Sequence, residues 1–314
     1  MTDFVCERCN HDFKSKSRYE RHLLRKKPCK AVLTYDGDVD NIDSLINKVE
    51  NLSIKNLNPL VKWSGGKKDE IQKILEYIPS CYDTYIEPFV GGGALFFHLE
   101  PKKSVIADVH VELIDFYLAL KEGHADDIYK FMQQNKNDEE TYYKVRSLDP
   151  KDKVENAKRF YYLRKTCFRG MMRYNKKGEF NIPYGRYKSC NFDDLLEERY
   201  LKVLKNSEIF CTDFEKIFEK YNNSSNFMFL DPPYDSEFTD YGYCRFGVEE
   251  HERLAECFKK TKIKCLMVIG KTPLIQKLYK DYIVREYQKN YRFRLHSGRV
   301  GNEIDNMHLV IKNF

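Results

Sequence analysis

The sequence predicts an α/β fold with a small metal-binding head in front of it. Three observations predict the fold class. An extended segment at 84–90 runs into three glycines and an apolar helix, a second at 105–107 ends in Asp108, and a third at 226–230 ends in Asp231. Strands that end in glycines or a carboxylate are typical of an open parallel sheet that binds its ligand at the carboxyl ends of its strands.

The composition excludes several classes of protein. The chain has 314 residues, which suggests two domains, and its 42% of hydrophobic residues can build a sizeable core. The apolar run at 265–269 is far shorter than the ~20 residues of a membrane span. The first residues lack the apolar segment of a secretory signal. We therefore expect an intracellular protein, neither secreted nor membrane-embedded, whose 10 cysteines are not paired as disulfides.

The charge is distributed unevenly along the chain. The net charge is only +6, but residues 1–35 hold nine Lys/Arg and four Asp/Glu. Residues 36–58 hold five acidic residues and two lysines. The basic head indicates a polyanionic partner such as nucleic acid, and the alternative is a solvated basic surface. Charge alone does not decide between the two.

Four residues of the head have the spacing of a zinc site. Cys6 and Cys9 are separated by two residues, twelve residues lie between Cys9 and His22, and six lie between His22 and Cys29. Thiolates with imidazole favour zinc over harder cations. The alternative is a cysteine-rich N-terminus without metal. We expect structural Zn²⁺ on these four residues.

The residues between these ligands support the same interpretation. Phe13 and Tyr19 stand where a ββα finger has its two core residues. The head resembles the two-cysteine, two-histidine zinc finger, with a final Cys in place of the second His. A finger helix that begins near Ser15 would present Arg18 and Arg21 to base edges. One finger binds DNA weakly, so the head either assists a larger DNA-binding body or binds a protein, and the sequence leaves both open.

The connector at 34–58 contains one helical stripe. Ile42, Leu45, Val49 and Leu52 recur at spacings of three, four and three residues. Two heptads are too few to indicate a coiled-coil dimer, so we expect a partly helical linker.

The first motif of the body indicates a cofactor that contains a nucleoside. The segment 84–97 has the form of a nucleotide-binding strand, turn and helix, although it lacks the full G-x-G-x-x-G pattern. Asp108 follows at the end of the next extended segment, where a carboxylate can accept both ribose hydroxyl protons. The alternative role of Asp108 is to cap a helix.

Residues 110–205 interrupt the α/β pattern. They are polar and helical, and at 164–187 cationic and aromatic residues alternate densely. This composition fits stacking on bases and binding of phosphates, with a hairpin tip at 176–178. A solvated β-ribbon is the alternative, but it would not need so many aromatics.

The tetrapeptide at 231–234 (DPPY) indicates methylation of an amino group. The lone pair of an adenine amine is delocalised into the ring. A carboxylate and a backbone carbonyl that accept both N–H bonds would favour a pyramidal nitrogen and free that lone pair. An adjacent aromatic ring would stack on the extruded base. The alternative is an ordinary exit from a strand into a turn.

Four motifs in this order resemble those of the Dam-type N6-adenine DNA methyltransferase family. They are 62–67 (KWSGGK), 87–93 (EPFVGGG), 173–187 and 231–234 (DPPY), and the resemblance covers 59–314. It implies a Rossmann-like core that binds S-adenosylmethionine, with a helical target-recognition insert. It also implies double-stranded DNA as the partner. Chains that join such a finger to a methyltransferase resemble proteins of large DNA viruses.

The resemblance also implies roles for single residues. Asp231, Pro232 and Tyr234 would hold the flipped adenine. The cofactor would be contacted by Trp63, Lys67, Phe89, Gly91, Asp108, Asp213 and Asp231, of which Asp213 would reach its adenine ring.

Within the insert, the resemblance implies the residues that read DNA. Phe168 would insert into the base stack, with Arg169 beside it in place of the usual Asn. Base edges and flanking groups would be contacted by Lys62, Met171, Arg173, Asn175 and Pro183. Lys62, Arg173 and Pro183 match members that read GATC, which is therefore the expected site. The sequence Asp305-Asn306 departs from the family and makes the pairing of the last strand uncertain.

The predicted organisation therefore has four parts. These are a zinc finger at 1–33, a linker at 34–58, a catalytic core at 59–119 and 206–314, and a recognition insert at 120–205. The expected activity is S-adenosylmethionine-dependent methylation of adenine N6 in duplex DNA. The alternatives are an inactive zinc-finger protein that only grips DNA, and a methyltransferase acting on RNA or on cytosine N4.

Overall fold

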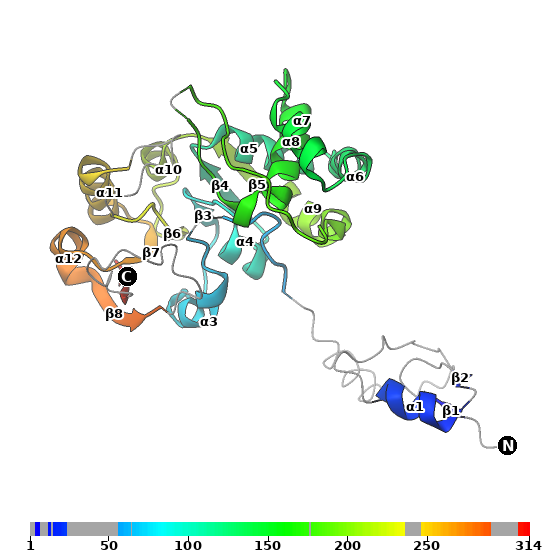
Figure 1. Cartoon of the computed structure of the whole chain (residues 1–314). Coiled ribbons are helices and arrows are strands. Elements are labelled where there is room, and N and C mark those ends of the chain that lie inside the picture. Colours follow the sequence, from blue (N-terminus) through cyan, green and yellow to red (C-terminus); the bar gives the residue numbers. More distant parts are fainter. Residues whose placement is uncertain are drawn as a thin grey trace, which may run out of the picture. The chain divides into compact units, whose positions relative to one another are not determined.

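The computed structural model describes residues 4–6, 12–13, 15–23, 56–63, 65–175, 177–235, 246–289 and 307–314. The chain divides into two compact units, residues 1–55 and 56–314 (Figure 1). The linker stripe at 42–52, Cys9, Cys29, Asp305 and Asn306 lie outside the described residues. The predicted boundaries at 33, 58, 119 and 205 stay predictions.

The described residues of the first unit form two short strands and a helix. Strand β1 (Phe4–Val5) pairs antiparallel with β2 (Asp12–Phe13), and helix α1 (Lys16–Leu23) follows. The backbone N–H groups of Arg18 and Tyr19 both donate to the carbonyl of Ser15, so the first turn begins where the sequence places it. Arg18 and Arg21 are exposed on this helix.

The second unit is built on a seven-stranded sheet in the order β5-β4-β3-β6-β7-β9-β8. The first five strands in this order are parallel, whereas β9 runs antiparallel to both β7 and β8. After β3, strands β4 and β5 are added on one side of it in the sheet, and β6 is then added on its other side. The switch point of the sheet therefore lies between β3 and β6, where α/β folds bind their ligands. The strands are β3 (Tyr85–Glu87), β4 (Ser104–Asp108), β5 (Ser207–Cys211), β6 (Phe227–Leu230), β7 (Lys264–Gly270), β8 (Ile283–Gln288) and β9 (Met307–Lys312).

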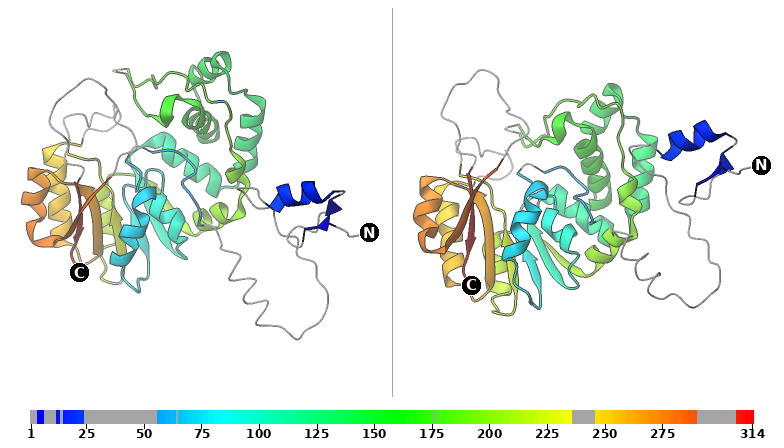
Figure 2. Two further views of the ribbon diagram at one scale, coloured as in Figure 1. Left: turned by 60° about the horizontal axis from the view of Figure 1, so that its bottom comes forward. Right: turned by 90° about the horizontal axis from the view of Figure 1, so that it is seen from below.

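The central strands are buried on both faces because alternate side chains enter two different cores. Ile106 belongs to the core under α4 (Ala94–Leu99) and α5 (Val111–Lys121), whereas Val105 and Ala107 belong to the core under α10 (Phe214–Lys220), α11 (Val248–Lys260) and α12 (Pro273–Tyr279). In Figure 2 the gold and orange helices α11 and α12 lie on one side of the sheet, and the cyan α4 lies on the other. This burial explains the continuous apolar runs of the predicted strands at 105–108 and 226–230, which are confirmed. The extended segment predicted at 84–90 is a strand only at Tyr85–Glu87, because a turn begins at Pro88.

The insert is attached to the core through one long helix. Helix α8 (Lys153–Thr166) packs against α5, and also against α6 (Ala125–Gln134) and α7 (Glu139–Arg146). Asp152 begins α8 by accepting hydrogen bonds from the N–H groups of Val154 and Glu155, and Asp138 caps α7 in the same way. The other helices of this unit are α3 (Ile71–Ile74) and α9 (Glu198–Lys205), with short 3₁₀ turns at Lys68–Glu70, Leu75–Tyr77, Phe168–Gly170, Asp193–Leu196 and Lys280–Tyr282.

The segment at 164–187, which the sequence predicts to form a hairpin tip at 176–178, has little regular structure beyond the end of α8. After α8 the chain forms two isolated antiparallel bridges, Cys167 with Tyr184 and Tyr174 with Phe180. Its tip is a turn in which the N–H of Gly178 donates to the carbonyl of Asn175. We call residues 167–175 and 177–187 the recognition segment. Several backbone hydrogen bonds also join its two arms, but they do not form a continuous ladder.

None of the helices in the described part of the chain combines the length and the apolarity that crossing a membrane requires.

Candidate active site

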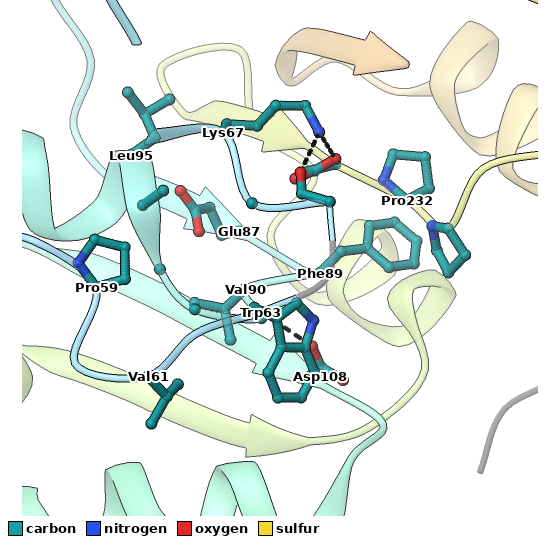
Figure 3. A pocket seen from close by; sticks show the side chains of 18 of the residues that line it. Pro59, Val61, Trp63, Lys67, Glu87, Phe89, Val90, Leu95, Asp108 and Pro232 are labelled. Atoms are coloured by element: carbon teal, nitrogen blue, oxygen red, sulfur yellow. Dashed lines mark hydrogen bonds and ion pairs between the residues drawn. The ribbon is translucent and has the colours of Figure 1, made fainter. Parts of the chain in front are cut away.

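A cavity of about 520 Å³ opens at the switch point, at the carboxyl ends of β3, β4 and β6 (Figure 3). Residues from three segments distant in sequence line it: 59–63 with 65–68, 87–95 and 231–234. All seven residues predicted to contact the cofactor line it, as do Pro232 and Tyr234. Its lining also includes Glu87, Phe246, Glu250 and Arg253, to which sequence reasoning assigned no role.

The glycine turn after β3 forms one wall of the cavity. Gly91 has a φ of +46°, and a Cβ on it would lie 2.6 Å from Cδ1 of Trp63. Its N–H donates to Oδ2 of Asp108 at 3.1 Å. The turn therefore needs glycine for its backbone conformation and for the close approach of the indole.

Asp108 lies at the end of β4 with its carboxylate inside the site. It accepts hydrogen bonds from the N–H groups of Gly91 and, at 3.0 Å, of His110. Burial raises the pKa of Asp108 to about 6, against the effect of these hydrogen bonds. Its alternative role as a helix cap is wrong, because the cap of α5 is the side chain of His110, which accepts from the N–H of Leu113.

Aromatic rings form a second wall. Phe89 packs against Phe214 and Phe246 with ring centroids 5.4 and 5.7 Å apart. Trp63 contacts the ring of His110 edge-on at 5.5 Å. A flat heterocycle would find apolar faces here and the Asp108 carboxylate close by.

Lys67 and Asp231 form an ion pair at the centre of the cavity. The side chain of Lys67 is 1% exposed, and its ammonium donates to the Asp231 carboxylate, to the Tyr234 hydroxyl at 2.8 Å and to the Gly65 carbonyl at 3.1 Å. Figure 3 shows the lysine reaching the carboxylate next to Pro232. Burial raises the pKa of Asp231, and the charge of Lys67 opposes the rise. The DPPY motif therefore presents a hydrogen-bonding carboxylate and an aromatic ring in one place.

A buried network under Lys67 joins the site to the last two strands. Glu70 accepts hydrogen bonds at 2.6 Å from the Tyr287 hydroxyl and from Nδ1 of His308, and Nζ of Lys289 lies 2.5 Å from its Oε1. Burial acts to raise the pKa of Glu70, but the His308 hydrogen bond and the charge of Lys67 lower it to about 2. The pairing of β9 that Asp305-Asn306 left uncertain is thus antiparallel to β7 and β8.

Glu87 ends β3 on the floor of the cavity and is fully buried. The Tyr85 hydroxyl donates to its carboxylate. Burial, together with the negative charge of Asp231, raises the pKa of Glu87 to about 8. The side chain is therefore largely a neutral carboxylic acid near pH 7.

Asp213 lines the cavity, but its carboxylate already has protein partners. It caps α10 by accepting from the N–H of Glu215, and it receives two hydrogen bonds from the Arg253 guanidinium at 3.0 and 2.9 Å. Arg253 stacks over Phe214 with its guanidinium carbon 4.6 Å from the ring centroid. Arg253 lies 40 residues away on α11, and no local pattern predicts this pair.

Lys62, which also lines the cavity, contacts the recognition segment. Nζ of Lys62 lies 4.8 Å from the ring centroid of Tyr187, and a Cβ on Gly170 would lie 2.8 Å from Cδ of Lys62. The N–H of Phe168 donates to the Pro183 carbonyl at 2.8 Å, while the Phe168 side chain is 41% exposed. An exposed ring on a braced turn is suited to insertion between bases.

Three other residues with predicted DNA contacts lie in the same segment. Arg169 adopts a φ of +54° next to Phe168. Arg173 donates from Nε to Asn181 at 2.8 Å, and the Asn175 side chain accepts from the N–H groups of Lys177 and Glu179 within the hairpin tip. The hydrogen bonds of Asn175 thus stabilise the turn.

Two of the four expected zinc ligands can be placed. Nε2 of His22 lies 3.3 Å from Sγ of Cys6, and both side chains are buried. Among the residues that the structure describes, no three His, Cys, Asp or Glu side chains form a metal-binding group.

The chain matches known proteins over most of its length. Residues 63–293 match the model of the D12 class N6 adenine-specific DNA methyltransferase family. The chain is 60% identical to a type II methyltransferase of Paramecium bursaria Chlorella virus NC1A, over 82% of this chain and all of that protein. It is 33% identical to a DNA adenine methylase of Haemophilus influenzae, over 64% of this chain and 74% of that protein. It is 35% identical to a DNA N-6-adenine-methyltransferase of Escherichia phage P1, over 71% of this chain and 31% of that protein.

Gly91→Ala is expected to disturb Trp63, the only tryptophan of the chain. Its new Cβ combines a positive φ with the clash against the indole. Gly123→Ala is the matched control, because Gly123 has a φ of +96° with no atom within 4 Å of the added Cβ. We expect Gly91→Ala to cost about 1–3 kcal/mol more than Gly123→Ala in urea unfolding and to shift the Trp63 emission. Equal costs and unchanged emission would contradict this packing.

Glu87→Gln is expected to flatten the pH dependence of stability. The folded pKa of Glu87 is raised, so its stabilising effect is complete below its ordinary pKa of 4.5 and is lost as pH rises to about 8. The wild type should lose up to about 1.4 kcal/mol per pH unit in this window relative to the variant. Unfolding curves at several pH values measure this difference, with the exposed Glu252→Gln as control. A parallel pH dependence of wild type and Glu87→Gln would show that Glu87 is ionised in the folded protein.

Proposed function

The chain belongs to the D12 class N6 adenine-specific DNA methyltransferase family, and from that premise we propose which DNA site it methylates and how its residues act. It is an adenine-specific DNA methyltransferase with S-adenosylmethionine as methyl donor. The proposal is methylation of adenine N6 at GATC in duplex DNA, on a base flipped out of the helix. The observation that carries it is the cluster of Lys67, Asp231 and Tyr234 inside the cavity.

The cavity fits the cofactor on structural grounds. At Gly91 the backbone leaves open a space that a Cβ would fill. Asp108 is a buried carboxylate at the end of β4, and Phe89 packs against other aromatic rings. Asp108 would accept the ribose hydroxyls, and Trp63 and Phe89 would flank the adenine ring. Asp213, which accepts two hydrogen bonds from Arg253, would also contact the adenine ring of the cofactor. When bound, S-adenosylmethionine supplies an electrophilic methyl group on a sulfonium sulfur.

Asp231 and Tyr234 would act on the target adenine. The Asp231 carboxylate would accept one N–H of the amine and the backbone carbonyl of Pro232 the other, while Tyr234 stacks on the base. The raised pKa of Asp231 suits it to take the proton that N6 loses. In the structure the Lys67 ammonium donates a hydrogen bond to the Asp231 carboxylate. This supports the same carboxylate as the acceptor for an N–H of the adenine N6 amine.

The position of the cluster supports base flipping. Lys67 is 1% exposed and Asp231 pairs with it inside the cavity, where an adenine stacked in a duplex cannot reach. Phe168, with Arg169 beside it, would occupy the gap that the base leaves. Lys62, Met171, Arg173 and Pro183 would contact the remaining base edges, with Asn175 beside them.

For the first unit we propose a structural zinc ion on Cys6, Cys9, His22 and Cys29. Bond lengths of ~2.3 Å to sulfur and ~2.0 Å to nitrogen with tetrahedral angles would place the two atoms about 3.5 Å apart. The 3.3 Å between Cys6 and His22 is close to that value. Arg18 and Arg21 on α1 would assist DNA binding, and a protein partner is the other use of the head.

We also propose that the protein acts inside a cell, where its DNA substrate lies. The 60% identity to an enzyme of a chlorella virus supports a viral origin.

Methyl transfer should require both GATC and Asp231. Tritiated S-adenosylmethionine is incubated with duplexes that contain GATC or GTAC, which have the same composition. We expect N6-methyladenine in the GATC duplex alone, and a rate lowered about 10²–10³-fold or more by Asp231→Asn. The exposed Asp281→Asn should retain wild-type activity.

Other outcomes of this assay separate the alternatives. Label in both duplexes would refute the GATC assignment but keep the enzyme. N4-methylcytosine, or transfer to RNA only, would replace the proposed substrate. A protein that binds the cofactor and methylates none of these would be a catalytically inactive DNA-binding protein.

One zinc ion per chain is expected in the purified protein. Cys6→Ser should lose it, whereas Cys81→Ser, which changes an exposed cysteine of the second unit, should retain it. Mass spectrometry of the metal content measures this difference. A Cys6→Ser protein that still holds one zinc would refute the proposed ligand set.

A further inference from the structure

The dipeptide Lys62–Trp63 belongs to two sites at once. Trp63 lines the cavity, against the glycine turn at Gly91. The neighbouring Lys62 lies over the Tyr187 ring and against Gly170, both in the recognition segment. A change in the position of Trp63 in the cavity would therefore also change the position of Lys62 against the recognition segment.

Arg164 fastens this dipeptide to the recognition segment. Its side chain is 1% exposed at the end of α8. Nη1 donates to the Met171 carbonyl at 2.8 Å, Nη2 donates to the Lys62 carbonyl, and the guanidinium carbon lies 5.5 Å from the centroid of the Trp63 ring. A planar guanidinium can bind two carbonyls in fixed directions, which an ammonium cannot do.

A second connection starts at Asp108. Its carboxylate accepts from the N–H of His110, whose ring Nδ1 accepts from the N–H of Leu113. Burial lowers the pKa of His110 to about 3, and the charge of Arg164 adds to this effect. The neutral ring therefore carries its proton on Nε2, which donates to the Tyr174 hydroxyl at 2.9 Å.

Tyr174 completes this connection in the recognition segment, between Arg173 and Asn175. Its hydroxyl donates to the carboxylate of Glu112, which pairs with Arg159 at 2.8 Å. The hydroxyl thus has both a donor and an acceptor, and the ring is fixed in one orientation.

We infer that Arg164, His110 and Tyr174 are positioning residues that couple occupancy of the cavity to the binding of specific DNA. Both connections begin at residues that would touch the cofactor, Trp63 and Asp108, and end in the segment that would read bases. In its described residues that segment forms two isolated bridges and no continuous ladder. The side chains of Arg164, His110 and Tyr174 join it to α8, to the start of α5 and to the Lys62–Trp63 dipeptide. Cofactor and specific DNA therefore favour the same arrangement, and each raises the affinity for the other by the same factor. This inference rests on the proposed function.

Tyr174→Phe tests the second connection because it removes one oxygen. DNA affinity is measured by anisotropy with and without saturating S-adenosylhomocysteine, which cannot donate a methyl group. The wild type is expected to bind the duplex that it methylates at least about 5-fold more tightly with this ligand, and the GTAC duplex without such a gain. Tyr174→Phe should bring the factor close to one while calorimetry shows S-adenosylhomocysteine still bound to the free protein.

Two further variants complete the test. Tyr162→Phe is the matched control, because it loses a hydroxyl bonded to the Lys136 carbonyl elsewhere in the insert, and it should keep the wild-type factor. Arg164→Lys keeps the charge but cannot bridge Met171 and Lys62, so the factor should fall. Thermal unfolding of each variant confirms that it is folded.

Wild-type coupling in both Tyr174→Phe and Arg164→Lys would overturn the inference, as would an equal loss in Tyr162→Phe. A wild type that methylates DNA without any coupling would also overturn it and would leave the proposed function standing. A wild type that binds S-adenosylhomocysteine but methylates no DNA would count against the proposed function itself.

Discussion

The buried ammonium of Lys67 is the charge around which the second unit is arranged. A charge with 1% exposure is tolerated only with close partners, and Lys67 has the carboxylate of Asp231, the hydroxyl of Tyr234 and, by its charge, Glu70 beneath it. These partners come from the segment after β6 and the turn before α3, and Glu70 in turn binds Tyr287 and His308 of the last two strands. The contacts of this one charge thus connect the DPPY motif to the last two strands of the sheet.

The sheet explains why the motifs meet. Parallel strands bring their carboxyl ends to one edge, and the reversal of strand order between β3 and β6 leaves a gap there. The glycine turn, Asp108 and the DPPY motif all follow strands at this edge. The insert then adds the recognition segment, which Arg164 and Tyr174 join to the rest of the unit. The proposed chemistry thus lies at the ends of sheet strands, and the proposed reading of DNA lies on this segment.

Most of the site could be predicted from the sequence, because its motifs are short and local. The strands at 105–108 and 226–230 follow from apolar runs, and a strand within the predicted segment 84–90 is found at Tyr85–Glu87. The glycine turn and Asp231 come directly after these strands in the sequence. Contacts between distant residues could not be predicted. Arg253 binds Asp213 from 40 residues away and His308 binds Glu70 from 238 residues away, and neither pair belongs to a periodic pattern. The raised pKa of Glu87 likewise depends on burial that only the packed fold creates.

Titration of the protein with S-adenosylmethionine, followed by the emission of its single tryptophan, tests the central claim most directly. If the cavity at the switch point holds the cofactor, Trp63 emission changes with saturation at one equivalent, and Asp108→Asn weakens the binding. Labelled S-adenosylmethionine that binds in equilibrium dialysis while Trp63 emission stays unchanged would place the cofactor elsewhere and contradict the account.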